Sequence, residues 1–501
     1  MGFVFSRPVA AATSPAALPT LTIRNLTITP LELKQVERLD AHSHLHIPTT
    51  LHKTASRGGE EESASSARQE IKGIAIQPFS ECHTPVYTPD PARHEHLRLT
   101  FEDPDSGHSY SAEIPASSRR SIILKSHPKG SEEETKEFTA IYLPQHAYLA
   151  VFSSANLSSW MATLDSSLPI SSLSIPGTHN SPTCHVALPS VRCQAVSVLE
   201  QLNNGVRFLD VRVSCPTYTP PKANRSSNNN DDSNNDNNHA SIPELSLVHS
   251  AFPVSLTGAK YLSGLLATLY SFLAAHPTET VLVSIKREGT GRGSDADLSQ
   301  ILYHHYIAPR RQHWYTSPQI PTLAGCRGRV VLVRRFRLAA SVPAAEGGID
   351  GSVWPDNVAD GTCGSGTIRI QDYYGVGSAA DIQRKVQFAQ EGLARAAQGV
   401  HATRPSEVPA GGPQMPLFIN FLSASNFFNA SCWPDRIAAK INPSMIEYLC
   451  MSHGAPGKGP GQLDIGDAAT GIVVTDWVGH NGDWDLIRCI VGWNARLQLR
   501  Q

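Results

Sequence analysis

Polar side chains that can transfer protons or bind anions end eight short apolar runs in the last two-thirds of the chain. Two of these side chains are imidazoles, His179 after SLSIPGT and His249 after ELSLV. Imidazole exchanges protons near neutral pH, so two of them facing one substrate could act as base and acid. The other runs supply cations, carboxylates and hydroxyls: Asp210 and Arg212 (GVRFLDVRV), Lys286 (TVLVSIKRE), Arg335 (RVVLVRRF), Asp372 and Tyr374 (TIRIQDYY), Ser423 (FINFLSAS) and Asp476 (GIVVTDWVG).

Asp210 and Arg212 stand two residues apart, so in a strand both side chains point to the same face. Inside a barrel the guanidinium needs a partner, and Asp210 is the nearest one. A guanidinium also matches the geometry of a phosphate. Together with Lys286 and Arg335, it predicts a cleft for an anion. The alternatives are a purely structural Asp210–Arg212 pair and, for each of the other cations, a solvated surface charge.

Asp476 ends the last apolar run, which neighbours the first run if the strands close into a barrel. Its carboxylate could then fix the tautomer of His179 and stabilise the charged imidazole, although a helix cap is the alternative. Asp372 and Tyr374 could supply the carboxylate and the stacking ring that a sugar-like ligand needs, or they could be structural. A histidine at a strand end, in a chain with 21 histidines, can also be structural.

Strands alternate with helical patterns from about residue 160, which favours a parallel α/β architecture. We expect an irregular TIM-type (β/α)8 barrel, whose active site lies at the carboxyl ends of its strands. Helices are predicted over residues 191–204 (stopped by Gly205), 258–276, 379–397, 434–450 and 483–494. The Asn-rich segment 216–240 cannot bury a core, so it predicts a disordered surface loop in place of a helix and a barrel that is incompletely closed there.

The N-terminal part has a different pattern. Short alternating runs separated by turn-rich segments predict a β-sandwich-like domain over residues 21–155, after a flexible N-terminus of residues 1–20. The N-terminus lacks the apolar core of a signal peptide, and its match to an N-myristoylation pattern at Gly2 and Ser6 is weak. The fold class predicted for the whole chain is therefore an α/β barrel preceded by a β-sandwich.

The bulk composition of the 501 residues excludes some partners. A formal net charge of −2 gives no electrostatic case for nucleic acid. No apolar stretch is long enough to span a bilayer, so the protein is expected to be soluble or peripheral to a membrane, and monomeric. Nine cysteines without a CxxC pair indicate neither a zinc site nor a redox motif. Their odd number favours a reducing, intracellular compartment, with Cys184 and Cys193 unpaired.

The strand-end blocks follow one another in a fixed order over residues 160–495: LSIPGTHNS, GVRFLDVRV, LVH, ETVLVSIKRE, GRVVLVRRF, IQDYY, INFLSA and GIVVTDWVG. Apart from the Asn-rich loop, their order and spacing resemble the phosphatidylinositol-specific phospholipase C X-domain family. The resemblance is closest to the metal-independent, bacterial-type branch. It implies an X-like barrel over residues 160–495 and leaves the first 150 residues outside the family.

The resemblance implies a role for each strand-end residue. His179 would be the general base that deprotonates the inositol 2-hydroxyl, and His249 the general acid that protonates the departing diacylglycerol oxygen. Arg212, beside Asp210, would stabilise charge on the phosphate, and Asp476 would orient His179. The wall that binds inositol would consist of Lys286, Arg335, Asp372 and Tyr374.

No metal and no cofactor are expected. The calcium-dependent branch of the family carries acidic residues on the strand where this chain has Asp210 and Arg212, and Arg212 would put positive charge where the ion sits. The chain departs from the bacterial-type pattern at Asn180, where an Asp normally follows the catalytic histidine. Because an amide supplies no charge, Asn180 predicts a lower turnover for the same type of reaction.

The resemblance therefore implies an enzyme that cleaves phosphatidylinositol, or a glycosylated relative, at a membrane surface into diacylglycerol and inositol 1,2-cyclic phosphate. One alternative is a non-catalytic inositol-lipid-binding or scaffold protein that keeps the X-domain shell. A related phosphodiester lipid with another headgroup is a third possibility.

Overall fold

The structure, a computed structural model, describes residues 18–39, 67–115, 121–129, 136–220, 243–364, 366–400, 415–456 and 465–500. The chain forms two compact units, one of Met1–Asn25 and Thr29–Val151 and the other of Leu26–Ile28 and Phe152–Gln501. Most of the predicted flexible N-terminus, including Gly2, and most of the Asn-rich loop lie outside the described residues.

The first unit consists of two five-stranded sheets. One has the order β4 (Ser80–Tyr87), β1 (Thr20–Leu26), β10 (Tyr148–Ser153), β9 (Phe138–Leu143) and β7 (Ser121–Ile123). The other has the order β3 (Ala67–Ile76), β2 (Leu31–Leu39), β5 (His96–Glu102), β6 (Ser109–Ile114) and β8 (Lys125–His127). Burial alternates along β5 with the period of two that a one-faced strand requires. Apolar side chains of both sheets, among them Ile23 and Phe101, form one buried cluster.

The second unit contains a mostly parallel sheet. Its consecutive parallel strands are β17 (Val330–Arg335), β15 (Val281–Arg287), β12 (Phe208–Ser214), β11 (Ile175–Thr178), β22 (Ile472–Thr475), β21 (Leu417–Phe421) and β20 (Ile368–Gln371). β16 (Trp314–Tyr315) and β18 (Ile349–Asp350) extend the β17 end, and β19 (Gly361–Cys363) pairs antiparallel with β20. Every predicted apolar run is a strand, and the last strand β22 neighbours the first strand β11, as expected for a barrel.

The sheet differs from a complete (β/α)8 barrel in two places. The third predicted strand, β13 (Ser246–His249), runs antiparallel to β12 and forms a hairpin with β14 (Phe252–Pro253), so β15 pairs directly with β12. A parallel neighbour needs a crossover connection, usually helical, and the Asn-rich sequence cannot form that helix. Within the described ranges, no strand pairing joins the β17 end of the sheet to the β20 end. The α/β class is confirmed, but the eight-stranded closure is not seen.

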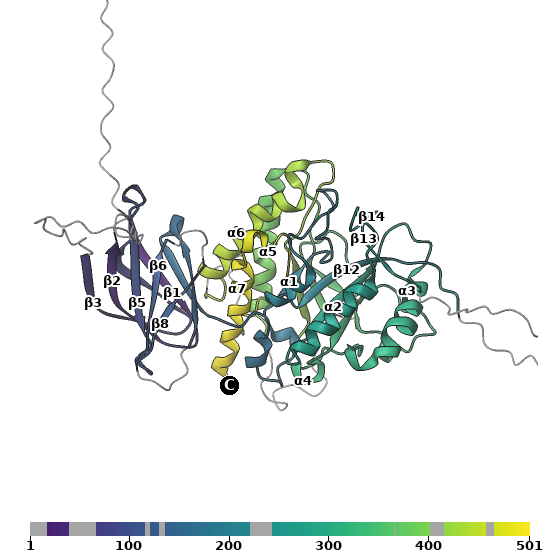
Figure 1. The fold of residues 1–501 in the computed structure, drawn as a ribbon, viewed down its shortest axis with the longest axis horizontal. Coiled ribbons are helices and arrows are strands. Elements are labelled where there is room, and N and C mark those ends of the chain that lie inside the picture. The colour runs from purple at the N-terminus through teal and green to yellow at the C-terminus, as the bar shows by residue number, and fades with distance from the viewer. Residues whose placement is uncertain are drawn as a thin grey trace, which may run out of the picture. The chain divides into compact units, whose positions relative to one another are not determined.

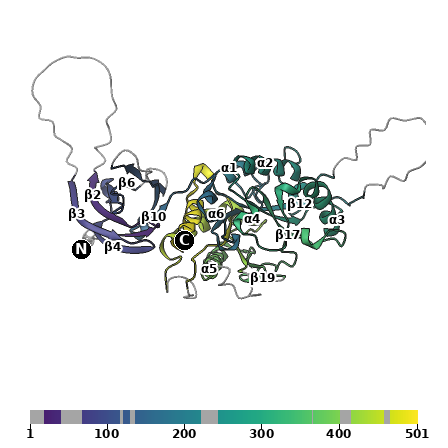
Figure 2. The same ribbon diagram turned by 90° about the horizontal axis from the view of Figure 1, so that it is seen from below.

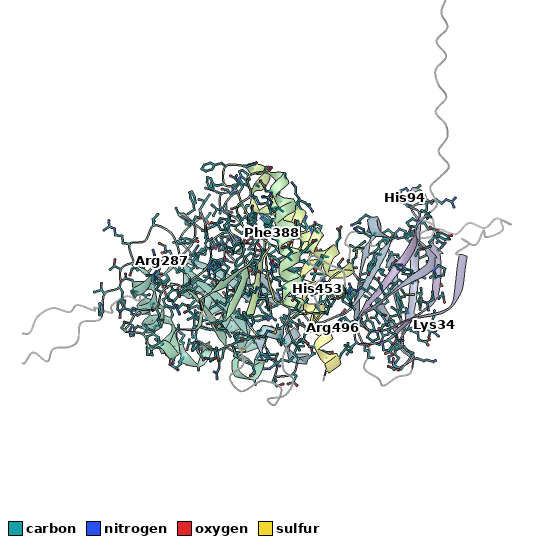
Figure 3. The ribbon with its side chains drawn as sticks, turned by 180° about the vertical axis from the view of Figure 1, so that it is seen from behind. Lys34, His94, Arg287, Phe388, His453 and Arg496 are labelled. Carbon is teal, nitrogen blue, oxygen red and sulfur yellow. The ribbon has the colours of Figure 1, made fainter. Side chains whose placement is uncertain are left out.

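Helices surround this sheet. They are α1 (Val198–Asn203), α2 (Leu262–Ala275), α3 (Asp295–Ile301), α4 (Leu323–Cys326), α5 (Ala379–Ala397), α6 (Pro434–Met451) and α7 (Asp485–Gly492), with a π-helical turn (Leu302–Ile307) after α3. α5, α6 and α7 pack side by side (Figure 1), whereas α1 and α2 lie together elsewhere on the sheet (Figure 2). Phe388 of α5, labelled in Figure 3, packs edge-on against Tyr373 beyond the end of β20. No helix in the described ranges combines the length and apolarity of a bilayer span.

Helix α1 is shorter than the predicted helix over 191–204, because Ser197 caps it by accepting a hydrogen bond from the Glu200 amide. Residues 182–197 form instead a loop over the carboxyl ends of the strands. Gly205 follows α1 with a φ of 104°, and a Cβ there would lie 2.9 Å from Ile487, so the turn requires glycine. In the loop, Cys184 and Cys193 are both free thiols, as predicted.

Candidate active site

His179 and Asp476 lie side by side because their strands are neighbours. Thr178 of β11 pairs with Thr475 of β22, so the residues that follow both leave the sheet at its carboxyl end. His179 Nδ1 lies 3.0 Å from Asp476 Oδ1, and its backbone N–H donates to Thr475 O at 2.9 Å. Asp476 is almost completely buried, and burial raises its pKa. The carboxylate therefore depends on its hydrogen bonds to stay ionised.

Arg212 determines which nitrogen of His179 can act as a base. Its Nη2 lies 2.9 Å from His179 Nε2, and a guanidinium can only donate. Nε2 is thus the unprotonated nitrogen, and Nδ1–H donates to Asp476. Burial and the nearby Arg212 charge lower the pKa of His179 well below its usual value. The imidazole is neutral at neutral pH, with its lone pair on Nε2, as a general base must be.

A network of ion pairs lines the floor of the site. Asp210 is fully buried and binds two guanidiniums, Arg212 at 3.1 Å and Arg335 at 3.2 Å. Glu288 bridges Arg212 at 3.1 Å and Lys286 at 2.8 Å. Burial alone would raise the pKa of Glu288, but Arg212 and Lys286 hold it at about 2. These carboxylates stay ionised and hold the cations in position.

His249 is the last residue of β13, in the β13–β14 hairpin. The hairpin brings its side chain to the cavity at the carboxyl ends of the parallel strands, although β13 itself runs antiparallel. Its Nδ1 lies 2.8 Å from Val191 O, so Nδ1–H donates and Nε2 is left for a ligand. The rings of His249 and His179 are 5.7 Å apart and nearly perpendicular. Burial and the Arg212 charge lower the pKa of His249 to about 4, and an anion bound beside the ring would raise it.

Opposite the histidines stands a wall of carboxylates and rings. Asp372 accepts a hydrogen bond from Trp354 Nε1 at 2.9 Å, and the Arg335 guanidinium stacks over the Trp354 ring at 3.7 Å. Tyr374 donates its hydroxyl to Asp356 at 2.8 Å. The walls enclose a cavity of about 520 Å³ lined by His179, Arg212, His249, Ser250, Lys286, Glu288, Arg335, Ser352, Trp354, Asp356, Asp372, Tyr374, Ser423, Ala424 and Ser425.

The structure brings together nearly all of the residues predicted for the site. Asp210 and Asp476 lie directly behind the cavity, and the other predicted side chains line it, apart from Asn180. The side chain of Asn180 is buried, and within the described residues neither its Nδ2 nor its Oδ1 has a hydrogen-bond partner. Its backbone N–H donates to Asp210 at 3.2 Å. Arg334, the neighbour of Arg335, points away and binds Asp350.

Sequence reasoning missed several groups of the site. Glu288 stands two residues after Lys286, so the alternation that singled out Arg212 would also have found it. Trp354 and Asp356 come from an irregular segment with no pattern to identify them. Gln194, from the loop before α1, donates its amide to His179 O at 2.7 Å, Thr475 O at 3.0 Å and Asp476 Oδ1 at 3.3 Å.

Potential metal ligands are few, because cations already bind Asp210 and Glu288. In the part of the chain that the structure describes, the group of nitrogen, sulfur and carboxylate donors close enough to share an ion is His179, Cys193 and His249.

Comparisons with known proteins agree with the resemblance in the sequence. No family model matches this chain. The 1-phosphatidylinositol phosphodiesterase of Listeria monocytogenes is 28% identical over 186 residues, which are 35% of this chain and 47% of that protein. The enzyme of the same name from Staphylococcus aureus strain Newman is 24% identical over 355 residues, 67% of this chain and 93% of that protein. The chain thus spans about half of the first relative and nearly all of the second.

Solved structures named phosphatidylinositol-specific phospholipase C also match this chain. A phosphatidylinositol-specific phospholipase C from S. aureus matches 67% of this chain and 97% of its own, with a TM-score of 0.49 and 21% identity. The L. monocytogenes enzyme matches 68% and 99%, with a TM-score of 0.46 and 19% identity. On the sequence comparisons, the predicted resemblance is confirmed: bacterial phosphatidylinositol-specific phospholipases C are homologues of this chain.

Proposed function

We propose that this protein is a phosphodiesterase that cleaves phosphatidylinositol, or a glycosylated relative, into diacylglycerol and inositol 1,2-cyclic phosphate. The observation that carries the proposal is the convergence of His179, His249 and Arg212 on one cavity, with the two imidazole rings 5.7 Å apart. Two homologues are named 1-phosphatidylinositol phosphodiesterase, which supports the same substrate.

The geometry suits an in-line displacement. Nε2 of His179 takes the proton of the inositol 2-hydroxyl, and that oxygen forms a bond to phosphorus while the bond from phosphorus to the diacylglycerol oxygen breaks. His249 gives its Nε2 proton to the leaving oxygen. Asp476 stabilises the imidazolium of His179, and Arg212 turns from Nε2 to the phosphate oxygens, where a guanidinium opposes the growing charge. The anionic phosphate raises the pKa of His249 and so supplies the acid.

The opposite wall suits a polyhydroxylated ring. Lys286, Arg335 and Asp372 present donors and acceptors to the cavity, and the ring of Tyr374 is 42% exposed beside them. Inositol hydroxyls can both donate and accept, so they match this mixture of charges. We propose that these residues bind the inositol headgroup, with Glu288 and Asp356 as further hydrogen-bond partners.

Exposed aromatic rings near the mouth of the cavity support a substrate that lies in a membrane. Phe252 follows the cavity-lining Ser250 by two residues, and Phe427 and Phe428 follow Ser425. The Phe252 and Phe427 rings stack 5.6 Å apart, and Phe428 is 95% exposed. Such rings bury favourably in the interface of a bilayer.

The finer architecture is also a proposal. We infer that residues 160–495 form an incomplete (β/α)8 barrel, from which the β13–β14 hairpin displaces one strand. We infer that residues 21–155 form a β-sandwich, because two sheets share one apolar cluster. The monomeric state, the intracellular location and the absence of a cofactor remain predictions.

The test is an assay of the purified full chain on phosphatidylinositol vesicles, with and without a chelator. We expect diacylglycerol and cyclic phosphate in both conditions. His179→Ala should lower the rate by about 10²–10⁴-fold, the usual worth of a general base. His304→Ala, which changes an exposed histidine remote from the cavity, is the matched control. If wild type and His179→Ala bind the headgroup equally and neither releases product, the result would indicate the scaffold alternative instead.

A further inference from the structure

A thiol that the proposed reaction does not use lies against the two imidazoles. Cys193 is buried in the loop before α1, and its Sγ is 3.7 Å from His249 Nδ1. One donor atom each from His179, Cys193 and His249 lie within 4.8 Å of one another. The loop is fixed at this point, since the Cys193 carbonyl accepts the Trp477 amide at 2.9 Å and its amide donates to Thr183 Oγ1 at 3.1 Å.

Charges of both signs surround this group, and the Arg212 guanidinium lies 2.9 Å from His179 Nε2. The carboxylates in and behind the cavity outnumber the cations. The carboxylates are Asp210, Glu288, Asp356, Asp372 and Asp476, and the cations are Arg212, Lys286, Arg335 and the buried Lys385.

We propose that His179, Cys193 and His249 form a zinc-binding site, and that Zn²⁺ bound there blocks the active site. Two imidazole nitrogens and one thiolate are donors that Zn²⁺ prefers, and both histidines line the cavity. Tetrahedral zinc with ordinary bond lengths separates its sulfur and nitrogen ligands by about 3.6 Å, close to the 3.7 Å between Cys193 Sγ and His249 Nδ1. The inhibition rests on the proposed function, whereas the binding does not.

Zinc has to displace several partners. The thiol loses its proton, Nδ1 of His249 gives up Val191 O, and His179 Nε2 gives up the Arg212 donor. Because the Cys193 thiol must lose its proton to bind the ion, whereas both imidazoles are already neutral, Zn²⁺ affinity should increase as the pH rises from 6 to 8. A phosphate ligand draws Arg212 into the cavity and should compete with the ion.

The binding test uses Zn²⁺ titrated calorimetrically into the full chain, and Co²⁺ as a spectroscopic substitute, both without lipid. We expect a stoichiometric site and a thiolate-to-cobalt absorption band. Cys193→Ser should abolish the band and weaken Zn²⁺ binding by about tenfold or more, because a hydroxyl is a poor ligand for this ion. The control is Cys326→Ser, a buried thiol whose Sγ donates to Thr322 O and lies outside the cavity. Equal Zn²⁺ affinity in wild type and Cys193→Ser, or no stoichiometric site, would overturn the proposal.

The inhibition test measures phosphatidylinositol cleavage with increasing Zn²⁺, each variant being compared with its own zinc-free rate. Zn²⁺ should inhibit wild type and Cys326→Ser alike, and Cys193→Ser only at about tenfold higher concentration. Equal inhibition of all three would contradict the assignment. If wild type cleaves no inositol lipid, the proposed function fails while the binding test still decides the zinc site.

Discussion

Two arginines lie near the ends of strand β12, the fully buried Arg207 and the partly buried Arg212, and they differ in what they bind. Arg207, just before β12, pairs with Glu279 at 2.9 Å, and both side chains are completely buried. Its other N–H groups donate to the carbonyls of Leu157, Ser158, Leu202 and Val206. Arg212, near the other end of β12, donates to the side chains of His179, Asp210 and Glu288 instead.

The difference separates structure from function within one strand. Backbone carbonyls cannot move away, so Arg207 holds the segments around it together and has no donor left for a ligand. The acceptors of Arg212 are side chains that line or back a cavity, so a phosphate can replace one of them. An arginine in the protein interior therefore indicates a binding site when its partners are side chains that a ligand can replace, and a structural role when its partners are backbone carbonyls.

Arg212→Lys should have the largest effect on catalysis. An ammonium keeps the charge but loses the fork that reaches Asp210, Glu288 and a phosphate together. We expect kcat to fall by about 10²–10³-fold, the range for loss of a donor that opposes transition-state charge. Thermal unfolding should change little. Activity close to that of wild type would indicate that Arg212, like Arg207, has only a structural role.

Arg207→Met should have the opposite result. Removing one partner of a buried pair leaves Glu279 charged without a cation beside it, which costs about 3–5 kcal/mol of stability. Denaturant unfolding should show this loss, while the activity of the fraction that stays folded should equal that of wild type. Arg207→Met with Glu279→Met should recover much of the stability. A variant that is stable but inactive would contradict the assignment of a structural role to Arg207 and a functional role to Arg212.

The sequence predicted the strand ends better than the connections between them. α5 has the predicted bounds of 379–397, and β22 lies beside β11, because periodicity and strand order depend on local sequence and chain topology. The position of His249 on a hairpin could not be predicted from the sequence. The antiparallel direction of β13 depends on which strands pair with it, and that pairing is set by the tertiary fold. The helix predicted over 191–204 rests on the spacing of Val196, Val198, Leu199 and Leu202, and the last three of these lie in α1. Residues 191–196 form a loop instead, and its backbone groups bind His249 and Trp477.

Gln194→Met tests that loop and should have a smaller effect. The variant removes the amide donor 3.3 Å from Asp476 Oδ1, so the pKa of Asp476 should rise further. A hydrogen bond to a charged group contributes about 1.5–3 kcal/mol, and we expect about a tenfold loss of kcat with the acid limb of the pH–rate profile moved to higher pH.

Gln201→Met is the control for this variant. Gln201 is equally buried but binds Thr178, Ser181 O and Val196 O, away from the carboxylate. Its loss should lower stability without moving the pH profile. If both variants leave the profile unchanged, Gln194 supports only the loop.

The most direct test of the account is an NMR titration of the histidine rings, assigned with His179→Gln and His249→Gln, in the presence of inositol 1-phosphate. We predict that both rings respond with a single dissociation constant and that the pKa of His249 rises from about 4, because the phosphate is held between the two imidazoles and Arg212. A phosphate that shifts only one of the two rings, or neither, would contradict the central claim.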